Sequence, residues 1–198
     1  MPFITFEGIE GCGKSTQAQR LADRLGSRAV VTREPGGTAI GRAIREVLLD
    51  PANRGLTPTT ELLLYFSDRA QHMVEVVRPA LAQGRIVVCD RHVETSLAYQ
   101  GYGRGLGLDL IRRLNDEATG GLIPDLTLLL DVPPEVGLSR EGAQLDVTGR
   151  ESLEFHERVR EGFLALARGE PERFVVIDAT LPEGEVSERA LAAVEKLL

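Results

Sequence analysis

A glycine-rich segment near the start of the chain has the spacing of a phosphate-binding loop. Its sequence is Gly8-Ile9-Glu10-Gly11-Cys12-Gly13-Lys14-Ser15-Thr16. Glycines allow the backbone to curl so that several N–H groups point at phosphate oxygens, and the helix expected to follow adds the positive end of its dipole. In this pattern Lys14 reaches the β- and γ-phosphates, and the Ser15 hydroxyl binds Mg²⁺. The segment therefore predicts binding of a nucleoside triphosphate.

The lysine of this loop stands out because arginine is the usual basic residue of the chain. Only two of the 23 basic residues are lysines, Lys14 and Lys196. A compact ammonium group acts as a point charge, whereas a guanidinium group is a planar fork. This usage favours a functional role for Lys14.

Charged residues also follow four of the apolar segments that we expect to form strands. They are Glu7, Arg33-Glu34, Asp90-Arg91-His92 and Asp131. In open parallel sheets, ligands bind beyond the carboxyl ends of the strands. Four charged ends on one edge of a sheet predict a polar, ion-rich cleft.

Asp90 and the two arginines give this cleft a chemical interpretation. A carboxylate that ends a buried strand commonly faces Mg²⁺ in proteins with a phosphate-binding loop, although Asp90 could instead cap a helix. Arginine forks pair with phosphate in bidentate fashion, so Arg33 and Arg91 suggest a second phosphate, carried by an acceptor. The alternative for either arginine is a salt bridge to Glu34 or Asp90.

A phosphorylated acceptor would simplify the chemistry, because its oxygen is ionised near pH 7 and no general base is needed. Catalysis then consists of alignment and charge neutralisation. The sequence offers no obvious base. Its histidines, His72, His92 and His156, show no cluster and are expected to have structural or surface roles.

Alternating strand and helix signals predict the elements that would position these residues. The expected strands are Phe3–Phe6, Ala29–Thr32, Arg85–Cys89, Leu126–Leu130 and Phe174–Ile177. The expected helices cover 14–25, 38–49, 59–83, 93–100, 107–118, 134–140, 151–168 and 183–197. Apolar strands between helices indicate an α/β fold of the P-loop NTPase type, a five-stranded parallel sheet with helices on both faces.

Composition excludes several other classes of protein. The 198 residues suit a single domain over 1–198, and a net charge of −7 without a basic block argues against nucleic-acid binding. No apolar run approaches the roughly 20 residues of a membrane span, and no leader is evident. Cys12 and Cys89 offer neither metal-ligand spacing nor a disulfide framework, so we expect a cytoplasmic protein.

Several segments, in order along almost the whole chain, resemble the thymidylate kinase family. They are 6–16 (Phe-Glu-Gly-Ile-Glu-Gly-Cys-Gly-Lys-Ser-Thr), 32–38 (Thr-Arg-Glu-Pro-Gly-Gly-Thr), 65–72, 90–92 (Asp-Arg-His), 96–101, 124–127 and 177–180. The resemblance implies transfer of the γ-phosphoryl group of ATP to dTMP with Mg²⁺, giving ADP and dTDP for dTTP synthesis. It also implies a homodimer.

Carried over by position, the resemblance assigns roles around the acceptor. Glu10 would accept a hydrogen bond from the sugar 3′-hydroxyl, and Arg33 and Arg91 would hold the phosphate. Tyr65 would stack on thymine beside Phe66, although both residues could simply belong to the core.

The remaining roles concern the base and the sugar. Arg69 would bond the base edge, Thr95 and Ser96 would border the pyrimidine, and Tyr99 would close against the 2′ position. Tyr99 could also be a core residue.

A lid at about 140–150 departs from the family pattern. No basic residue lies between Arg140 and Arg150, and Val147 stands where the family has an arginine. By position Arg140 suits the adenine or the outer phosphates. Either Arg150 supplies the catalytic charge, or neutralisation comes from elsewhere.

Two alternatives remain open at this point. A kinase for another nucleoside or nucleoside monophosphate would share the loop, but a nucleoside kinase would need a base. The other alternative is a nucleotide-operated switch. A GTPase switch would need an Asn-Lys-x-Asp element to read guanine, and neither Asn53 nor Asn115 is followed by lysine.

Overall fold

Five short apolar segments form one parallel sheet in the computed structural model, which describes residues 1–141 and 151–198. The strands are β1 (Phe3–Glu7), β2 (Ala29–Arg33), β3 (Ile86–Asp90), β4 (Leu126–Asp131) and β5 (Phe174–Asp178). Their order across the sheet is β2-β3-β1-β4-β5. The order reverses beside β1, so its carboxyl end opens into the crevice where ligands bind in such sheets.

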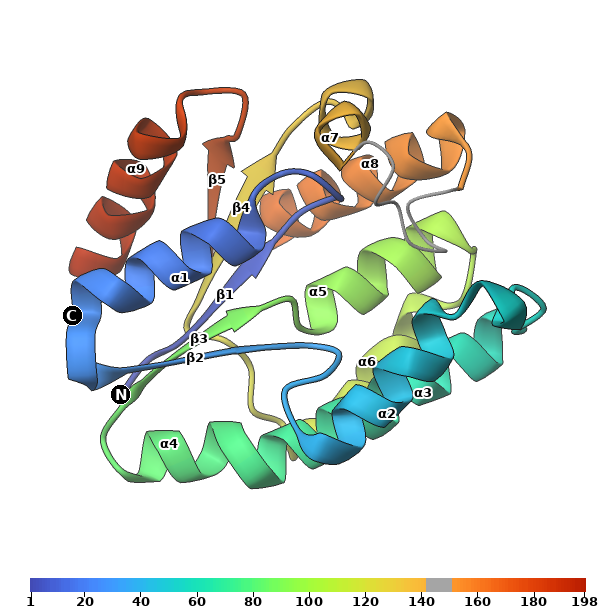
Figure 1. The fold of residues 1–198 in the computed structure, drawn as a ribbon, viewed down its shortest axis with the longest axis horizontal. Helices are drawn as coiled ribbons and strands as arrows, with labels where there is room; N and C mark the ends of the chain where they lie inside the picture. Colours follow the sequence, from blue (N-terminus) through green and yellow to red (C-terminus); the bar gives the residue numbers. More distant parts are fainter. Residues whose placement is uncertain (142–150) are drawn as a thin grey trace.

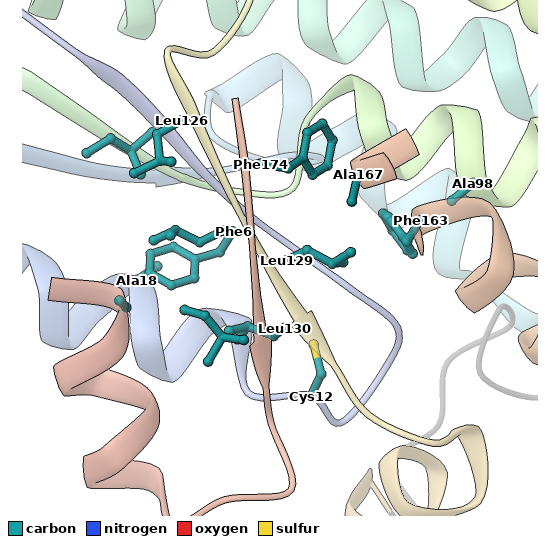
Figure 2. Packing of buried hydrophobic residues seen from close by; sticks show 14 of the residues in the cluster. Phe6, Cys12, Ala18, Ala98, Leu126, Leu129, Leu130, Phe163, Ala167 and Phe174 are labelled. Atoms are coloured by element: carbon teal, nitrogen blue, oxygen red, sulfur yellow. The ribbon is translucent and has the colours of Figure 1, made fainter. Parts of the chain in front are cut away.

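Helices cover both faces of this sheet (Figure 1). Helices α1 (Lys14–Leu25) and α9 (Glu183–Glu195) pack on one face, and α4 (Arg78–Ala82) and α8 (Leu153–Gly169) pack on the other. Successive strand residues alternate between the faces. Figure 2 shows Phe6 and Leu130 on the side of Ala18 of α1, whereas Leu129 lies on the side of Phe163 of α8. The predicted α/β fold is confirmed.

The remaining helices surround the carboxyl edge of the sheet. They are α2 (Ala39–Leu49), α3 (Pro58–His72), α5 (Val93–Ser96), α6 (Leu108–Thr119) and α7 (Pro134–Glu141), with short 3₁₀ turns at 26–28 and 51–53.

Two predicted helices differ from the structure because each contains a π-helical segment. The expected helix 59–83 is divided by π-helical residues 73–77, and the expected helix 93–100 continues as a π-helix over 97–103. Pro79 lacks the N–H that an α-helix would use, and the widened turn lies directly before it. π-Helical turns are frequent at functional sites.

Each strand extends one residue further than the apolar run predicts, and the added residue is charged. Arg33 of β2 pairs in register with Asp90 of β3, and Asp131 of β4 pairs with Asp178 of β5. Glu7 lies opposite Leu129. The parallel ladder therefore delivers these charged side chains to one edge of the sheet.

Helix α7 comes into direct backbone contact with the phosphate-binding loop. A Cβ atom at Gly11 would overlap the carbonyl oxygen of Gly137, and a Cβ atom at Gly137 would overlap the carbonyl oxygen of Glu10. Gly11 also has a φ of 68°, a conformation that glycine adopts without strain. Two glycines are thus required where the loop crosses α7.

Candidate active site

One cleft of about 370 Å³ joins the phosphate-binding loop to the ends of β2 and β3. It is lined by Glu10, Gly11, Gly13, Lys14, Ser15, Thr16, Arg33, Glu34, Pro35, Arg45, Leu49, Tyr65, Asp90, Arg91, Thr95 and Tyr99. Residues that are distant in the sequence, from the loop, the Arg-Glu-Pro segment and the Asp-Arg-His segment, therefore face one space.

The loop has the backbone that its glycines predict. Gly8, Gly11 and Gly13 have φ values of 139°, 68° and 93°. Lys14 opens α1 and is largely buried, and its Nζ donates a hydrogen bond of 2.7 Å to the carbonyl of Ile9. The ammonium group is thus held over the loop.

Ser15 and Asp90 form a candidate metal-binding pair. The Ser15 hydroxyl donates a hydrogen bond to Oδ2 of Asp90 across 75 residues of sequence. Oδ1 of Asp90 is buried and has no hydrogen-bond partner among the residues that the structure describes. A hydroxyl and a carboxylate with a free oxygen are oxygen ligands of the type that Mg²⁺ prefers. The chemistry of this pair fits the predicted Mg²⁺ site.

Arg91 lies between the loop and helix α5. Its Nη1 donates to the carbonyl of Gly8 and to the hydroxyl of Thr95, both at 3.2 Å. Its Nη2 lies 3.3 Å from Oε1 of Glu10. The guanidinium group is therefore oriented by the phosphate-binding loop itself, and it faces the cleft.

Glu10 carries its negative charge into this cleft. Burial raises the pKa of Glu10, but the nearby Arg91 and Lys14 cations outweigh burial and hold the pKa below its ordinary value. Its Oε2 accepts a hydrogen bond of 2.5 Å from the hydroxyl of Tyr99. Burial and the Glu10 carboxylate raise the pKa of Tyr99, so this phenol remains a donor.

The histidines are arranged differently from the sequence-based expectation, because two of them share one carboxylate. Nδ1 of His72 lies 2.8 Å and Nδ1 of His92 lies 3.1 Å from Oε1 of Glu34. His156 is also buried, with Nδ1 3.5 Å from Oε2 of Glu10. The expected absence of a cluster is wrong, because strand pairing and α3 bring His72 and His92 together on Glu34. All three histidines are fully buried.

Glu34 also holds Arg69 of α3. Nε of Arg69 donates to Oε2 of Glu34 at 2.8 Å, and Nη2 donates to the Ser96 hydroxyl at 3.2 Å. Nη1 is buried and has no partner within the described residues. Burial raises the pKa of Glu34, but Arg69 and His92 hold it well below its ordinary value. A charged Glu34 therefore fixes Arg69 and leaves the two N–H groups of Nη1 without a partner among the described residues.

Several predicted residues lie behind the cleft rather than along it. Phe66 is 5% exposed and lies beneath Arg69, whose guanidinium carbon is 4.6 Å from the ring centroid. Cys12 is buried in the core (Figure 2). Ile9 is also buried, and its carbonyl rather than its side chain serves the loop. Tyr65 lies on the cleft wall.

The predicted lid at about 140–150 lies mostly outside the described residues. Arg140 lies in the last turn of α7, and its Nη1 donates to the carbonyl of Ala179 at 2.9 Å and contacts that of Gly11 at 3.4 Å. It therefore lies beside the phosphate-binding loop. Arg150 and Val147 fall outside the described residues.

Sequence reasoning missed two cleft residues, Arg45 and Leu49 of α2. Nη1 of Arg45 donates to the carbonyl of Pro35 at 3.1 Å, which places α2 against the Arg-Glu-Pro segment. This third arginine of the cleft carried no local signal, because an arginine on an amphipathic helix is usually a solvated residue.

Comparison with known proteins agrees with this geometry. The sequence model of the thymidylate kinase family matches residues 6–190. The chain belongs to the thymidylate kinase family. The thymidylate kinase of Geobacter sulfurreducens is 58% identical over 89% of this chain and 88% of its own length. That of Deinococcus radiodurans is 53% identical over 98% of this chain and 96% of its own length.

A solved structure supports the same family. The thymidylate kinase of Ehrlichia chaffeensis superposes with a TM-score of 0.81 at 36% identity, covering 98% of both chains. The resemblance drawn from the motifs is therefore confirmed. Among the described residues, no helix of this family member has the length and apolar character to cross a membrane.

Proposed function

We propose that the protein transfers the γ-phosphoryl group of ATP to dTMP, giving ADP and dTDP. The observation that carries this proposal is a single cleft that holds two sets of phosphate-binding groups. Lys14 and the loop backbone form one set, and Arg33 and Arg91 form the other. Two sets suit a donor and an acceptor that both carry phosphate. Family membership supports the same reaction.

In the proposed reaction an oxygen of the dTMP phosphate attacks the γ-phosphorus of ATP. The new P–O bond forms as the bond to the β-phosphate oxygen breaks, and that oxygen leaves on ADP. The acceptor oxygen is ionised at neutral pH, so no side chain removes a proton. Lys14, Arg91 and the loop N–H groups align the reactants and neutralise the charge on the moving oxygens.

Ser15 and Asp90 would hold Mg²⁺ in this reaction. Their support is the hydroxyl–carboxylate contact and the free buried oxygen of Asp90. When bound, Mg²⁺ supplies positive charge to the phosphate oxygens of ATP.

Residues of the cleft wall and residues buried behind it would recognise the nucleoside of dTMP. Tyr65 of the wall would stack on the thymine. Nη1 of Arg69, which lies behind the wall next to Ser96, would reach the base edge. Thr95 would border the pyrimidine.

The sugar would lie against Glu10 and Tyr99. Glu10 would accept the 3′-hydroxyl, and the Tyr99 ring would fill the space at the 2′ position. The short bond between these two residues supports one shared sugar site.

The decisive experiment measures ADP release from ATP and Mg²⁺ with each common nucleoside and nucleoside monophosphate. dTMP should be preferred, and dUMP tests how strictly the base is recognised. A preference for a nucleoside would favour a nucleoside kinase instead, and ADP release without any acceptor would favour a nucleotide-operated switch.

We also propose a cytoplasmic homodimer. Helices α2, α3 and α6 expose apolar side chains that a second copy could cover, among them Ile40, Val47, Leu63 and Leu110. Both cysteines of the chain are free, which suits a reducing compartment. Light scattering during size-exclusion chromatography tests the dimer, and a monomeric mass at micromolar concentration would contradict it.

A further inference from the structure

Glu7 is a buried carboxyl group at the end of β1 that the proposed reaction does not use directly. Its side chain has no exposed surface, and its Oε1 accepts a hydrogen bond of 2.6 Å from the backbone N–H of His92. Its Oε2 accepts a second bond, of 2.5 Å, from the Thr95 hydroxyl. One side chain of β1 thus joins the turn that follows β3 to helix α5.

The turn held by Glu7 contains a strained residue. Arg91 has a φ of 73°, and it is the only non-glycine residue with a positive φ in the part of the chain described. This conformation is unfavourable for a residue with a side chain and persists only where the surroundings determine it. The N–H of His92 belongs to the peptide group directly after Arg91. The backbone conformation of Arg91 therefore decides whether this N–H meets Glu7.

The same turn aims the Arg91 side chain. Thr95 donates its hydroxyl proton to Glu7 and accepts a hydrogen bond of 3.2 Å from Nη1 of Arg91. Glu7 therefore contacts both the peptide group that follows Arg91 and a side chain that receives its guanidinium group. An apolar residue could fill the same space, but it would leave the His92 N–H buried without a partner.

We propose that Glu7 is a positioning residue for phosphoryl transfer. By holding the His92 N–H and the Thr95 hydroxyl, it fixes the strained backbone of Arg91 and aims the guanidinium group into the cleft. The inference rests on the proposed function, because it takes Arg91 as the group that binds the acceptor phosphate.

The surroundings of Glu7 indicate that the length of its side chain matters more than its charge. Burial, together with the nearby Glu94 carboxylate, raises the pKa of Glu7 to about 8, against smaller opposite effects of the Thr95 hydrogen bond, Arg91 and the His92 N–H. At neutral pH the group is mainly a neutral acid, whose carbonyl oxygen still accepts from the His92 N–H and whose O–H can donate to the Thr95 oxygen. Glutamine has the same length and can make the same two contacts, because its amide oxygen accepts and its amide nitrogen donates.

Two variants of the whole chain separate the effect of side-chain length from the effect of charge. Glu7→Gln keeps the length and removes the charge, whereas Glu7→Asp keeps the charge and is one methylene shorter. We expect the Kd of dTMP, measured by calorimetry, to rise about 10-fold or more in Glu7→Asp and to stay within about 3-fold in Glu7→Gln. The Kd of ATP should change by less than about 2-fold in both.

Thr5→Val is the matched control for buried polar groups of the same strand. The Thr5 hydroxyl is buried 3.1 Å from that of Thr127, away from the cleft. This variant should lower the free energy of unfolding and leave the Kd of dTMP unchanged. A loss of dTMP affinity in Thr5→Val would mean that any disturbance of β1 has this effect, which would overturn the proposal.

Other outcomes decide the proposal as clearly. Normal dTMP affinity in Glu7→Asp overturns it, and so does an equal loss of ATP and dTMP affinity. If Glu7→Asp does not fold, hydrogen exchange of the parent decides. The His92 N–H should exchange as slowly as the amides of β3, and fast exchange overturns the proposal. A parent protein that binds no dTMP would contradict the proposed function instead.

Discussion

The hydroxyl of Tyr99 donates a hydrogen bond of 2.5 Å to Oε2 of Glu10, which joins the π-helical segment after α5 to the phosphate-binding loop. The other oxygen of Glu10 lies 3.3 Å from Nη2 of Arg91. One carboxylate thus sets both the position of the Tyr99 ring and the position of the guanidinium group. If the acceptor sugar lies against this pair, the ring determines the room at its 2′ position.

Replacing Tyr99 therefore tests discrimination against ribonucleotides. Tyr99→Ala should narrow the preference for dTMP over ribothymidine monophosphate by about 1–2 kcal/mol, because the ring no longer excludes the 2′-hydroxyl. Tyr99→Phe keeps the ring and loses only the bond to Glu10, so it should keep the preference. The measurement is the ratio of kcat/KM for the two acceptors. An unchanged ratio in a folded Tyr99→Ala protein would make Tyr99 a core residue only.

Lys14 should be essential for turnover. Lys14→Met is expected to lower kcat by at least about 100-fold, since a preorganised positive charge beside the transferred group is lost. The other lysine provides the control, because Lys196→Met lies at the exposed C-terminal end and should be fully active. Circular dichroism should show both variants folded. A kcat within a few-fold of the parent would remove Lys14 from the mechanism.

Asp90 should control the response to Mg²⁺. Asp90→Asn is expected to raise the Mg²⁺ concentration for half-maximal rate by about 10-fold or more, because the amide is a weaker ligand than the carboxylate. Asp131→Asn is the matched control at the end of β4, where Asp131 forms two hydrogen bonds with Arg160 at 2.7 and 2.8 Å. The Mg²⁺ titration should be normal in this control. An equal shift in both variants would contradict a specific role for Asp90.

Arg150 and Arg140, at the two ends of the predicted lid, should have different functions. Arg150→Ala is expected to lower kcat about 10-fold or more, roughly 1.4 kcal/mol of transition-state stabilisation, with little change in dTMP affinity. Arg140 is bonded to the carbonyl of Ala179, so Arg140→Ala should mainly raise the KM for ATP. Steady-state kinetics of both variants separate the roles. If kcat survives in Arg150→Ala and is abolished in Arg140→Ala, the catalytic charge belongs to Arg140.

Asp68 should make stability depend on pH. It is fully buried, and burial raises its pKa from 3.8 to about 6, although a bond from the Gly36 N–H acts in the opposite direction. Because the folded-state pKa exceeds the unfolded one, its stabilising contribution is complete below about pH 4 and is lost as the pH rises through about 6.

Asp68→Asn tests this dependence. The amide oxygen can still accept the bond from Gly36, and no charge is buried. We expect a gain in the free energy of unfolding on the order of 1–3 kcal/mol at pH 8 that shrinks towards zero near pH 4. Urea denaturation at both pH values measures it. A gain that is the same at both pH values would contradict the role of ionisation.

The sequence was sufficient for the architecture because its local signals agree with one another. Apolar runs located all five strands to within one residue at each end. The missing residues, such as Glu7 and Asp131, are charged, and only pairing with a neighbouring strand keeps them in the ladder. Helix 59–83 was right in extent, but a π-helical turn depends on how the helix packs around Pro79.

The site residues that belong to local sequence motifs could be predicted. Contacts that depend on the tertiary structure could not. The loop, Asp90 and Arg91 could be placed because each lies at the end of a strand or directly after it. The pairing of His72 and His92 on Glu34 could not, since it joins three segments through sheet order. Arg45 was missed for the same reason.

The contact between Gly11 and Gly137 has a mechanical consequence. Side chains between two elements can change rotamers and absorb a small displacement. Where two backbones are in direct contact, no side chain lies between them to do so. Any shift of α7 must therefore push the phosphate-binding loop by a similar amount. Helix α7, which precedes the predicted lid, and the phosphate-binding loop are thus expected to move together as one rigid unit.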